Sequence, residues 1–377
     1  MTTMGETERA FWVLLQGGLW EKKKKLSSSE HIDFNKVYRL SEEQSVIGLV
    51  TAGLDYVTDV SLPKEVVLQF VGYALQLEQR NQAMNSFVAE WVGKLRYGKM
   101  NPILIKGQGI AQCYEKPLWR TCGDVDFLLS ASDYETSKYL LMPYVQTEPK
   151  ETIESKEFCS MIDNWTIELH GSLHCRLTKR LDSFLDKIQS ECTETGRVRV
   201  WKYDNTDVFL PSVDNDILVI FTHIVKHFFR EGVGLRQVCD LCRLLWTYKT
   251  EIDHIVLKKR LKEGGIMTEW LAFAAFGVKY LGIPVEAMPL YSASRKWNRK
   301  AKKIKRLILE TGSFGHNRDL SYSEKYPVLV VKMISLCRHT WELLRQFFVF
   351  PLDSIRVWCS MVSIGINAMN EGKNDGV

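Results

Sequence analysis

The sequence predicts an α+β protein in which a set of strands lies between two helical regions. Apolar residues recur at helical spacing in both end regions, whereas the middle of the chain holds short alternating or continuous apolar runs that are typical of strands. The 377 residues, 45% hydrophobic and 25% charged, have the composition of a globular protein with a sizeable core. We expect a helical N-terminal region (1–98), an α+β core (99–211) and a helical C-terminal domain (212–377).

The N-terminal region is predicted to be helical over most of its length. Phe11, Leu14 and Leu15 follow helical spacing near its start. Ser41 and Gln44 have the spacing of a capping box, which predicts that the apolar run 46–54 forms a helix beginning after them. No residue pattern in this region points to chemistry.

The central region is predicted to contain five strands. The first two, ILIK and DVDFLL, are short apolar runs, and the later ones have alternating character. Gly107 ends the first strand, and Ser132 is expected to cap a helix that stops before Pro143. From Ser212 onward the apolar spacing is helical again. The predicted strands cover residues 103–106, 124–129, 165–170, 197–203 and 207–211.

Two carboxylates on the second predicted strand are the clearest sign of chemistry. Asp124 and Asp126 are two residues apart, so both side chains point to the same face of the strand, roughly 6–7 Å apart. Carboxylates that converge in this way repel each other unless a cation lies between them, and Mg²⁺ prefers such oxygen ligands. The alternative is a solvated strand end that carries two unrelated acids.

The neighbouring segments add groups of the kind that phosphate chemistry requires. Lys106 and Gly107 end the first strand, where a glycine lets the backbone approach a ligand and the start of a helix favours an anion. Glu168 is a third acid, on the polar face of the strand 165–170. An anion-binding turn and three strand carboxylates are the groups that two-metal nucleotidyl transfer requires. In that reaction two acids share both metal ions, and the third acid holds the ion that activates the attacking hydroxyl.

The order and spacing of these residues resemble the signature of a known family. The similarity is to the bacterial uncharacterised nucleotidyltransferase family, which belongs to the DNA polymerase beta-like nucleotidyltransferase superfamily. It implies a nucleotidyltransferase fold, with a mixed β-sheet core flanked by helices. The matching pattern is Lys106-Gly107, six residues, Tyr114, five residues, Arg120, three residues and Asp124-Val125-Asp126, followed later by Glu168-Leu169-His170, GVGLRQVCDL (232–241) and Gly-Ser-Phe-Gly (312–315).

The resemblance also implies roles for the site residues. It implies that the three acids Asp124, Asp126 and Glu168 bind Mg²⁺ and carry catalysis, with Glu168 nearest the acceptor hydroxyl. The phosphates of an NTP would contact the backbone amide of Gly107. The further nucleotide contacts implied are Lys106, Gln108 and Arg120.

Some of these assignments have alternatives. The superfamily usually has Gly-Gly or Gly-Ser at the phosphate turn, whereas this chain has Lys106-Gly107-Gln108, in which the lysine could offset phosphate charge as a point cation. Arg120 could form a salt bridge at the strand end instead of contacting a triphosphate. For Tyr114, packing in the core is favoured over stacking on a base.

The implied reaction is the transfer of an NMP from an NTP, such as ATP, to a hydroxyl-bearing acceptor. The expected cofactor is Mg²⁺, or alternatively Mn²⁺, and the expected by-product is pyrophosphate. A small molecule or a glycan is the favoured acceptor. The alternatives are a protein side chain or an RNA end as acceptor, and a catalytically silent nucleotide-binding scaffold.

Other candidate motifs are less informative. Two histidine pairs, at positions 170/174 and 223/227, have a spacing of four. Core or cleft positions are favoured over zinc binding, because His170 continues a strand and no third ligand is near His223 and His227. Cys239 and Cys242 form a single CxxC without a partner pair, which argues against zinc or redox chemistry. Asp240 is expected to make a hydrogen bond between helices, and a phosphate contact by Arg236 is disfavoured.

Charge is concentrated in two basic tracts. Lys22–Lys25 supplies four positive charges and residues 295–306 supply eight, so the rest of the chain has 38 basic and 45 acidic residues, or a net charge of −7. This balance argues against a nucleic-acid binder. The tract 295–306 is expected to be a solvated helical face, and the alternative is contact with an anionic surface.

The sequence also predicts a cytoplasmic protein. Nine scattered cysteines are an odd number, which argues against a secreted disulfide framework. The first residues include acids and lack the apolar segment of a signal peptide. The sequence contains no run of 18 uninterrupted apolar residues, so it does not predict a transmembrane helix.

Overall fold

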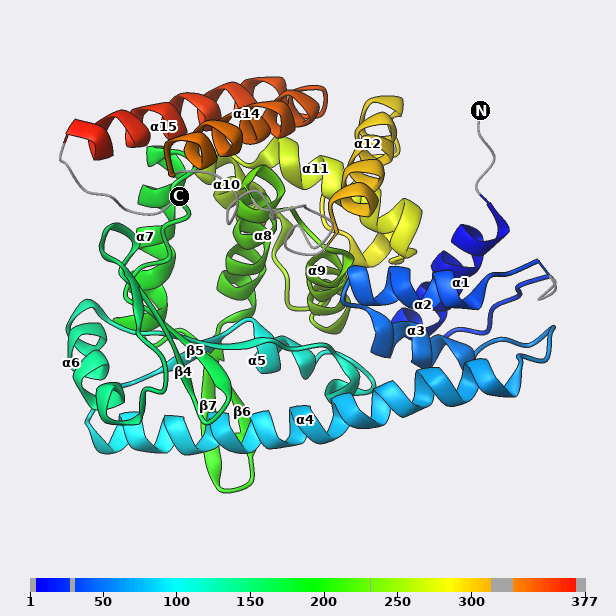
Figure 1. The fold of residues 1–377 in the computed structure, drawn as a ribbon, viewed down its shortest axis with the longest axis horizontal. Coiled ribbons are helices and arrows are strands. Elements are labelled where there is room, and N and C mark those ends of the chain that lie inside the picture. The colour runs from blue at the N-terminus through cyan, green and yellow to red at the C-terminus, as the bar shows by residue number, and fades with distance from the viewer. Residues whose placement is uncertain (1–4, 28–30, 231, 313–327, 371–377) are drawn as a thin grey trace.

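The computed structural model describes residues 5–27, 31–230, 232–312 and 328–370. Residues 313–315, most of the expected Gly-Ser-Phe-Gly run, lie outside these ranges. In the described part, helices from both ends of the chain lie around one mixed sheet that is formed by its centre (Figure 1). The predicted α+β class with helical N- and C-terminal regions is confirmed.

Three short helices at the N-terminus pack with their backbones close together. They are α1 (Glu6–Trp20), α2 (Phe34–Glu43) and α3 (Ile47–Leu54). Glycines make this approach possible: a Cβ atom on Gly18 of α1 would lie 1.9 Å from the carbonyl oxygen of Leu49. In the same way, a Cβ atom on Gly53 of α3 would lie 2.0 Å from the carbonyl oxygen of Leu14.

The predicted capping box at Ser41 and Gln44 is wrong. Ser41 lies in the last turn of α2, and the side chain that caps this helix is Asp33. The Gln44 side chain instead makes tertiary bonds: its Nε2 donates to the Ile308 carbonyl oxygen at 3.1 Å, and its Oε1 accepts from the Leu235 amide at 3.1 Å. Both side chains are buried. Gln44 links regions of the chain, whereas the Ser41 hydroxyl donates to the Val37 carbonyl oxygen within α2, so neither starts a helix.

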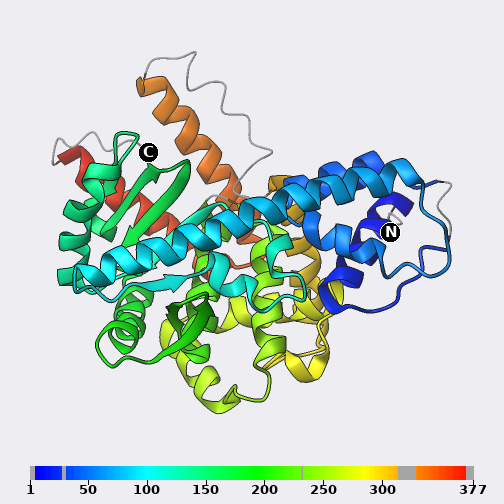
Figure 2. The same ribbon diagram turned by 90° about the horizontal axis from the view of Figure 1, so that it is seen from below.

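One long helix, α4 (Lys64–Tyr97), connects the N-terminal helices to the sheet. It crosses the molecule without interruption (Figure 2). Phe70, near its start, packs in the same apolar cluster as the N-terminal helices. Residues from Met84 to Leu95 form a second cluster with the strands. The helix therefore belongs to both parts of the structure.

The central sheet has seven strands in the order β3-β4-β5-β2-β1-β7-β6. The five strands predicted from the sequence are present, and β3 with β4 adds a hairpin at one edge. β2 pairs in parallel with β5 and antiparallel with β1, so the strands that carry the expected site residues are neighbours. The strands are β1 (Ile103–Ile105), β2 (Asp124–Leu128), β3 (Lys150–Thr152), β4 (Glu157–Ile162), β5 (Trp165–His170), β6 (Val198–Tyr203) and β7 (Thr206–Pro211).

The two faces of the sheet are covered by different parts of the chain. Val125 and Phe127 of β2 pack in the cluster that contains the second half of α4. The intervening residues point to the opposite face, where Leu128 belongs to the cluster formed with the C-terminal helices. Two of those helices, α8 (Val213–Arg230) and α9 (Leu235–Thr247), lie above this face in Figure 1.

Further helices surround this arrangement. The pair α14 (Val328–Phe347) and α15 (Pro351–Asn370) is held to the end of α8, because Gln346 Nε2 donates to the Phe228 carbonyl oxygen at 2.6 Å. A π-helical turn, Gly277–Leu281, follows α11. The remaining helices are α5 (Gly107–Ala111), α6 (Ala131–Leu141), α7 (Lys179–Thr193), α10 (His254–Gly264), α11 (Met267–Phe276), α12 (Arg295–Thr311), α14 (Val328–Phe347) and α15 (Pro351–Asn370).

The basic tract 295–306 begins α12, and part of it is used inside the molecule. Lys300 donates to a backbone carbonyl after α14, Lys303 Nζ donates to the neighbouring Phe348 carbonyl oxygen at 2.7 Å, and Lys305 pairs with Glu8 at 2.5 Å. Other members of the tract, such as Arg299, are exposed. The tract is thus both a solvated face, as expected, and a link between helices.

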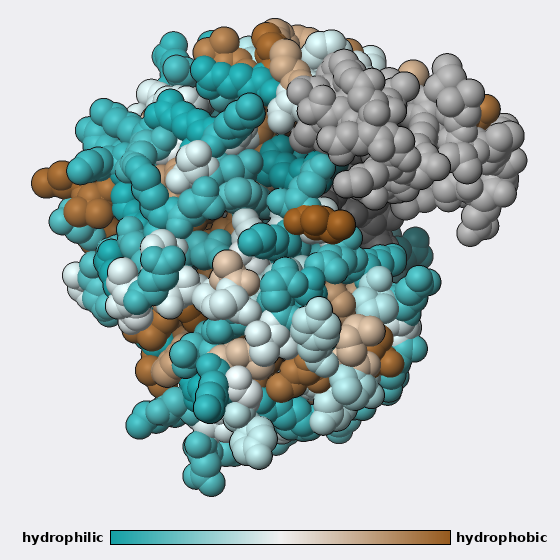
Figure 3. All heavy atoms as spheres, turned by 90° about the vertical axis from the view of Figure 1, so that its left-hand side faces the viewer, coloured by the Kyte–Doolittle hydropathy of each residue, from teal (hydrophilic) through white to brown (hydrophobic). Residues whose placement is uncertain are grey.

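The face on the left-hand side of Figure 1 is mostly hydrophilic, with small separate apolar groups (Figure 3). None of the helices in the described ranges combines the length and the apolar character that crossing a bilayer requires.

Candidate active site

The central strands place the expected acids on one face of the sheet. β2 and β5 run in parallel with Asp126 opposite Glu168, and β1 runs antiparallel with Ile105 opposite Asp126. Because side chains alternate along a strand, Asp124 and Asp126 share a face with Glu168 and His170. This is the face that α8 and α9 cover. The strand alternation predicted from the sequence therefore brings three acids to one place.

Asp126 lies at the centre of this group and is almost fully buried. Its Oδ1 atom is 2.8 Å from Lys106 Nζ and 2.9 Å from His170 Nε2. The same nitrogen of His170 is 3.5 Å from Glu168 Oε2. Two basic side chains therefore hold together carboxylates that would otherwise repel each other.

The pKa values reflect this mutual stabilisation. Burial would lower the pKa of Lys106, but the negative charges of Asp126, Glu168 and Asp124 outweigh burial and raise it. Burial would also lower the pKa of His170, yet its contacts with the two carboxylates raise it to about 9. Conversely, burial alone would raise the pKa of Asp126, and the two basic partners hold it below its usual value. Both basic groups are therefore charged near neutral pH.

Glu168 differs from Asp126 in its surroundings. Burial and the nearby Asp126 charge raise its pKa, although the contact with His170 acts in the opposite direction. Its side chain is 20% exposed, compared with 2% for Asp126. Glu168 is therefore the more exposed acid of this pair and has the higher affinity for a proton.

The turn between β1 and α5 has an unusual backbone. Lys106 has φ of 59° and ψ of −148°, and Gly107 has φ of 44°. A positive φ is uncommon for a residue with a side chain, so the surrounding structure must hold Lys106 in this conformation. Glycine adopts a positive φ without this cost, and a Cβ atom on Gly107 would lie 3.4 Å from the Asp124 carbonyl oxygen.

The hydrogen bond of the Gln108 side chain connects it to α4 and not to the acids. Its Nε2 lies 3.3 Å from Asn81 Oδ1, on α4. Asn81 in turn donates to the carbonyl oxygens of Leu118 and Arg120, both at 2.7 Å. Gln108 is therefore part of a buried bridge that fixes the loop before β2 to α4.

Arg120 forms a buried ion pair with the C-terminal region. Its Nε and Nη2 atoms donate to the two carboxylate oxygens of Asp240 in α9, at 2.8 and 2.6 Å. Tyr114 adds a third hydrogen bond to Asp240, at 2.7 Å. Of the two alternatives for Arg120, the structure therefore shows the salt bridge. Asp240 is expected from the sequence to form a hydrogen bond between helices, and it instead links α9 to the loop that enters the sheet.

A narrow cleft lies between the sheet and the helices that cover it. Asp124 lines this cleft, and its carboxylate has no hydrogen-bond or ion-pair partner among the residues that the structure describes. An adjoining cleft lies on the other side of Lys106 and His170 and includes Lys226 of α8. The first cleft is lined by Lys106, Gly107, Arg120, Asp124, Asp126, Ile220, His223, Arg236, Gln237 and Asp240.

Two side chains in these clefts, His170 and Arg236, lie closer to the acids than the sequence predicted. A core or cleft position is favoured for His170 by the sequence, and the structure puts it between two acids. Arg236 donates to the Thr121 carbonyl oxygen at 2.9 Å and lies near enough to Asp124 to feel its charge. The alternation of residues 168 and 170 already places them on one face, but the pairing of β2 with β5 is not encoded in either strand alone.

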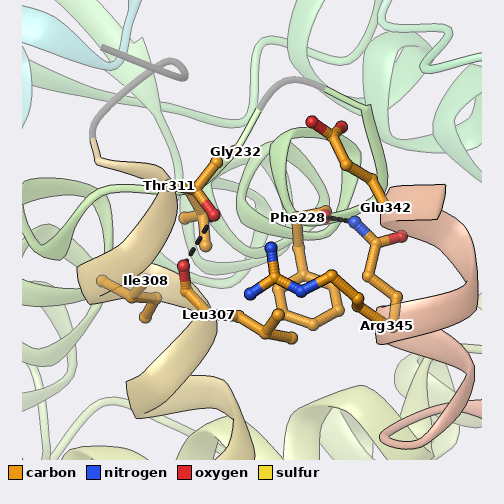
Figure 4. A pocket seen from close by; sticks show the side chains of 9 residues that line it. Phe228, Gly232, Leu307, Ile308, Thr311, Glu342 and Arg345 are labelled. Carbon is orange, nitrogen blue, oxygen red and sulfur yellow. Dashed lines mark hydrogen bonds between the residues drawn. The ribbon is translucent and has the colours of Figure 1, made fainter. Parts of the chain in front are cut away.

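Other cavities lie away from the acids. One is formed where α8, α12 and α14 meet, with Phe228, Leu307 and Ile308 on its apolar side and the Arg345 side chain extending among them (Figure 4). None of its lining residues is among the site residues that the sequence predicts.

The residues present fit a divalent cation. Ligand atoms of Asp126, Glu168 and His170 all lie within 4.8 Å of one another. Asp124 is on the same face, two residues from Asp126, and adds a further carboxylate. Carboxylate oxygens suit Mg²⁺ and Mn²⁺. An imidazole ligand must be neutral, so His170 would have to release its proton before it could join the carboxylates.

Comparison with known proteins agrees with this geometry. The sequence model of one family, described as uncharacterised nucleotidyltransferase, matches residues 30–281, about two thirds of the chain. No curated protein and no solved structure matches. The matched range includes α4, the whole sheet and the helices α8 and α9, and therefore all the candidate site residues. The chain belongs to the uncharacterised nucleotidyltransferase family.

Proposed function

We propose that this nucleotidyltransferase moves an NMP from an NTP to a hydroxyl-bearing acceptor, with Mg²⁺ or Mn²⁺ and with release of pyrophosphate. The observation that carries the proposal is the convergence of Asp124, Asp126 and Glu168 on one face of three paired strands, beneath a cleft. Such reactions need positioning and charge stabilisation and no covalent protein intermediate.

Each acid has a proposed role. Asp124 and Asp126 would hold the divalent cation, which supplies neutralisation of the phosphate charge when bound. Glu168 would lie nearest the acceptor hydroxyl, which agrees with its greater exposure and its raised pKa. A carboxylate with a raised pKa is suited to accept a proton from a hydroxyl group.

The nucleotide would enter from the side of the turn between β1 and α5. Gly107 would contact the phosphates through its backbone amide, where the absence of a side chain permits close approach. Lys106 and Arg236 place positive charges beside the acids of this cleft, where they can contact a polyphosphate. Gln108 and Arg120 would act less directly, by fixing the loop before β2 to α4 and to α9.

The favoured acceptor is a small molecule or a glycan. A protein side chain and an RNA end are the alternative acceptors within the same reaction. A catalytically silent nucleotide-binding scaffold is the alternative of a different kind, and it predicts nucleotide binding without pyrophosphate release.

The test is a transfer assay with NTPs labelled at the α-phosphate. The purified protein is incubated with each labelled NTP, Mg²⁺ or Mn²⁺, and a cell extract separated into small-molecule, glycan, protein and RNA fractions. We expect pyrophosphate release and label in one fraction, which identifies the acceptor class. Nucleotide binding without release at any concentration of either metal would favour the silent scaffold.

Variants connect the activity to the site. Glu168→Gln should lower the rate by roughly 10²–10³-fold, the usual cost of removing one charge-stabilising group from an active site. Asp163→Asn is the matched control, because Asp163 is an exposed acid in the adjacent turn with φ of 50°, a conformation that asparagine also adopts. Equal rates for the two variants would exclude Glu168 from catalysis.

A further inference from the structure

The ammonium group of Lys106 occupies the place where the carboxylates converge. Its Nζ atom lies 2.8 Å from Asp126 Oδ1, and its side chain is 14% exposed. The same oxygen is 2.9 Å from His170 Nε2. A carboxylate oxygen has two lone-pair positions, so two donors at these distances saturate it. A metal ion cannot coordinate Asp126 Oδ1 while both contacts persist.

The backbone of the chain directs Lys106 to this place. Ile105 pairs with Asp126 across β1 and β2, so the next residue leaves the strand directly beside the Asp126 carboxylate. Lys106 is held there with a positive φ that residues with side chains rarely adopt. Conformations of this kind persist at functional sites because the rest of the fold determines them. The position of the ammonium is therefore built into the fold.

Asp124 presents a contrast to Asp126. Its carboxylate lines the cleft and is half-buried, and within the described ranges it has no hydrogen-bond or ion-pair partner. Of the two acids on β2, one is therefore already neutralised by the protein, and the other is open to an incoming cation.

We propose that Lys106 takes the place of one of the two ions of a two-metal site, so that the protein binds a single divalent cation, at Asp124 and at the second carboxylate oxygen, Oδ2, of Asp126. This inference rests on the proposed function. The reaction itself is unchanged: the acceptor oxygen forms a bond to the α-phosphorus, and the bond from that phosphorus to the bridging oxygen breaks. Pyrophosphate leaves with the electron pair of that bond, and Glu168 takes the hydroxyl proton.

The test counts bound ions. Mn²⁺ replaces Mg²⁺, and the ions bound per chain are measured from the EPR signal of free Mn²⁺ after equilibrium dialysis, with a saturating α,β-methylene NTP analogue on both sides. We expect one ion for the wild-type protein. Lys106→Met removes the ammonium and should raise the count to two, whereas Lys106→Arg keeps the charge and should leave it at one.

A matched control removes a lysine elsewhere. Lys116 forms an exposed pair with Asp55 at 3.1 Å, so Lys116→Met should leave the count at one. Two ions in the wild-type protein, or one in a folded Lys106→Met variant, would overturn the inference. The number of Mn²⁺ ions bound by the wild-type protein tests the single-ion inference even if the Lys106→Met variant does not fold.

The transfer assay separates this inference from the proposed function. Pyrophosphate release together with two bound ions would refute only the role of Lys106. No release and no bound ion would refute the proposed function as well.

Discussion

Asp126 is the residue whose surroundings constrain the site most. It is buried beneath Lys106 and His170, which both contact its Oδ1 atom. Carboxylates on a strand are expected from the sequence to repel each other without a metal ion, but here the protein supplies the opposing charge itself. Removing Asp126 therefore leaves two buried basic groups with fewer partners, which makes this acid important for stability as well as for chemistry.

We predict that Asp126→Asn lowers the free energy of unfolding of the metal-free protein by about 3–5 kcal/mol, the usual cost of breaking a buried ion pair. Urea unfolding followed by circular dichroism measures this change. Asp124→Asn, on the same strand but without an ion-pair partner among the described residues, should change stability by less than about 1 kcal/mol. Equal effects of the two substitutions would contradict the ion-pair account.

A second prediction concerns the acid stability of the protein through His223. Burial, followed by the charge of Lys106, places the pKa of His223 well below its usual value. The unfolded chain therefore binds a proton near pH 6.5 that the folded chain does not, and stability is lost as the pH falls below that value. The basic groups that face His223 are Lys106 after β1, Arg236 in α9, and Lys226 and His227 in α8 itself.

His223→Gln should reduce this loss. Between pH 6.5 and pH 5, the unfolding free energy of the wild-type protein should fall more steeply than that of the variant, by up to about 1.4 kcal/mol per pH unit. Urea titrations at several pH values measure both slopes. His254→Gln, at an exposed site, is the control. Parallel pH profiles for wild type and His223→Gln would show that His223 is protonated in both states.

At the scale of secondary structure, the close packing of α1 and α3 depends on glycines. Gly53 lies so near to α1 that a Cβ atom would overlap with the Leu14 carbonyl oxygen, which is backbone and cannot move aside as a side chain does. The long helix α4 also contains a glycine, Gly72, but nothing lies within 4 Å of its added Cβ atom. The same substitution should therefore have opposite effects in these two helices.

We predict that Gly53→Ala lowers the free energy of unfolding by about 2 kcal/mol or more, because the helices must separate to admit the methyl group. Gly72→Ala should raise it by about 0.5–1 kcal/mol, because alanine has the higher helix propensity at an exposed position. Thermal unfolding of both variants measures the difference. A stabilising effect of Gly53→Ala would show that α1 and α3 pack differently.

The strands show which elements can be predicted from sequence. β1, β2 and β5 were predictable because their apolar residues form short runs or alternate between faces. β3 was not, because its three residues are all exposed and show no apolar pattern. β4 was not, because serine and cysteine give weak contrast between its two faces.

The candidate site was predictable to a similar extent. Alternation places Asp124 and Asp126 on one face of a strand, and Glu168 and His170 on one face of another. The contact of Lys106 with Asp126 depends on the pairing of β1 with β2, which arises only when the sheet assembles. The Arg120–Asp240 pair joins residues 120 positions apart, and no local pattern reveals such a partner.

At the scale of the whole molecule, the site is a joint product of three segments of the chain. The sheet carries the acids, α4 covers the face behind them, and α8 with α9 forms the opposite wall of the cleft. The core 99–211 expected from the sequence therefore holds the acids but not the whole site. Buried ion pairs such as Arg120–Asp240 tie it to the helices that follow.

We predict that the isolated segment 99–211 does not fold cooperatively. Both faces of its sheet would lose their covering helices, and apolar residues such as Val125 and Phe127 would be exposed to water. Thermal unfolding by circular dichroism and the dispersion of amide proton signals measure the outcome, with the full chain as the reference. A sharp transition in the isolated segment would show that it is an independent domain.

The continuity of α4 has a consequence for motion. Its 34 residues span roughly 50 Å at the usual rise of an α-helix, and no break interrupts them. Because an unbroken helix offers no hinge, the N-terminal helices and the sheet must move as one rigid body. Any opening of the cleft would then have to come from its opposite wall, α8 and α9, and not from a hinge within α4.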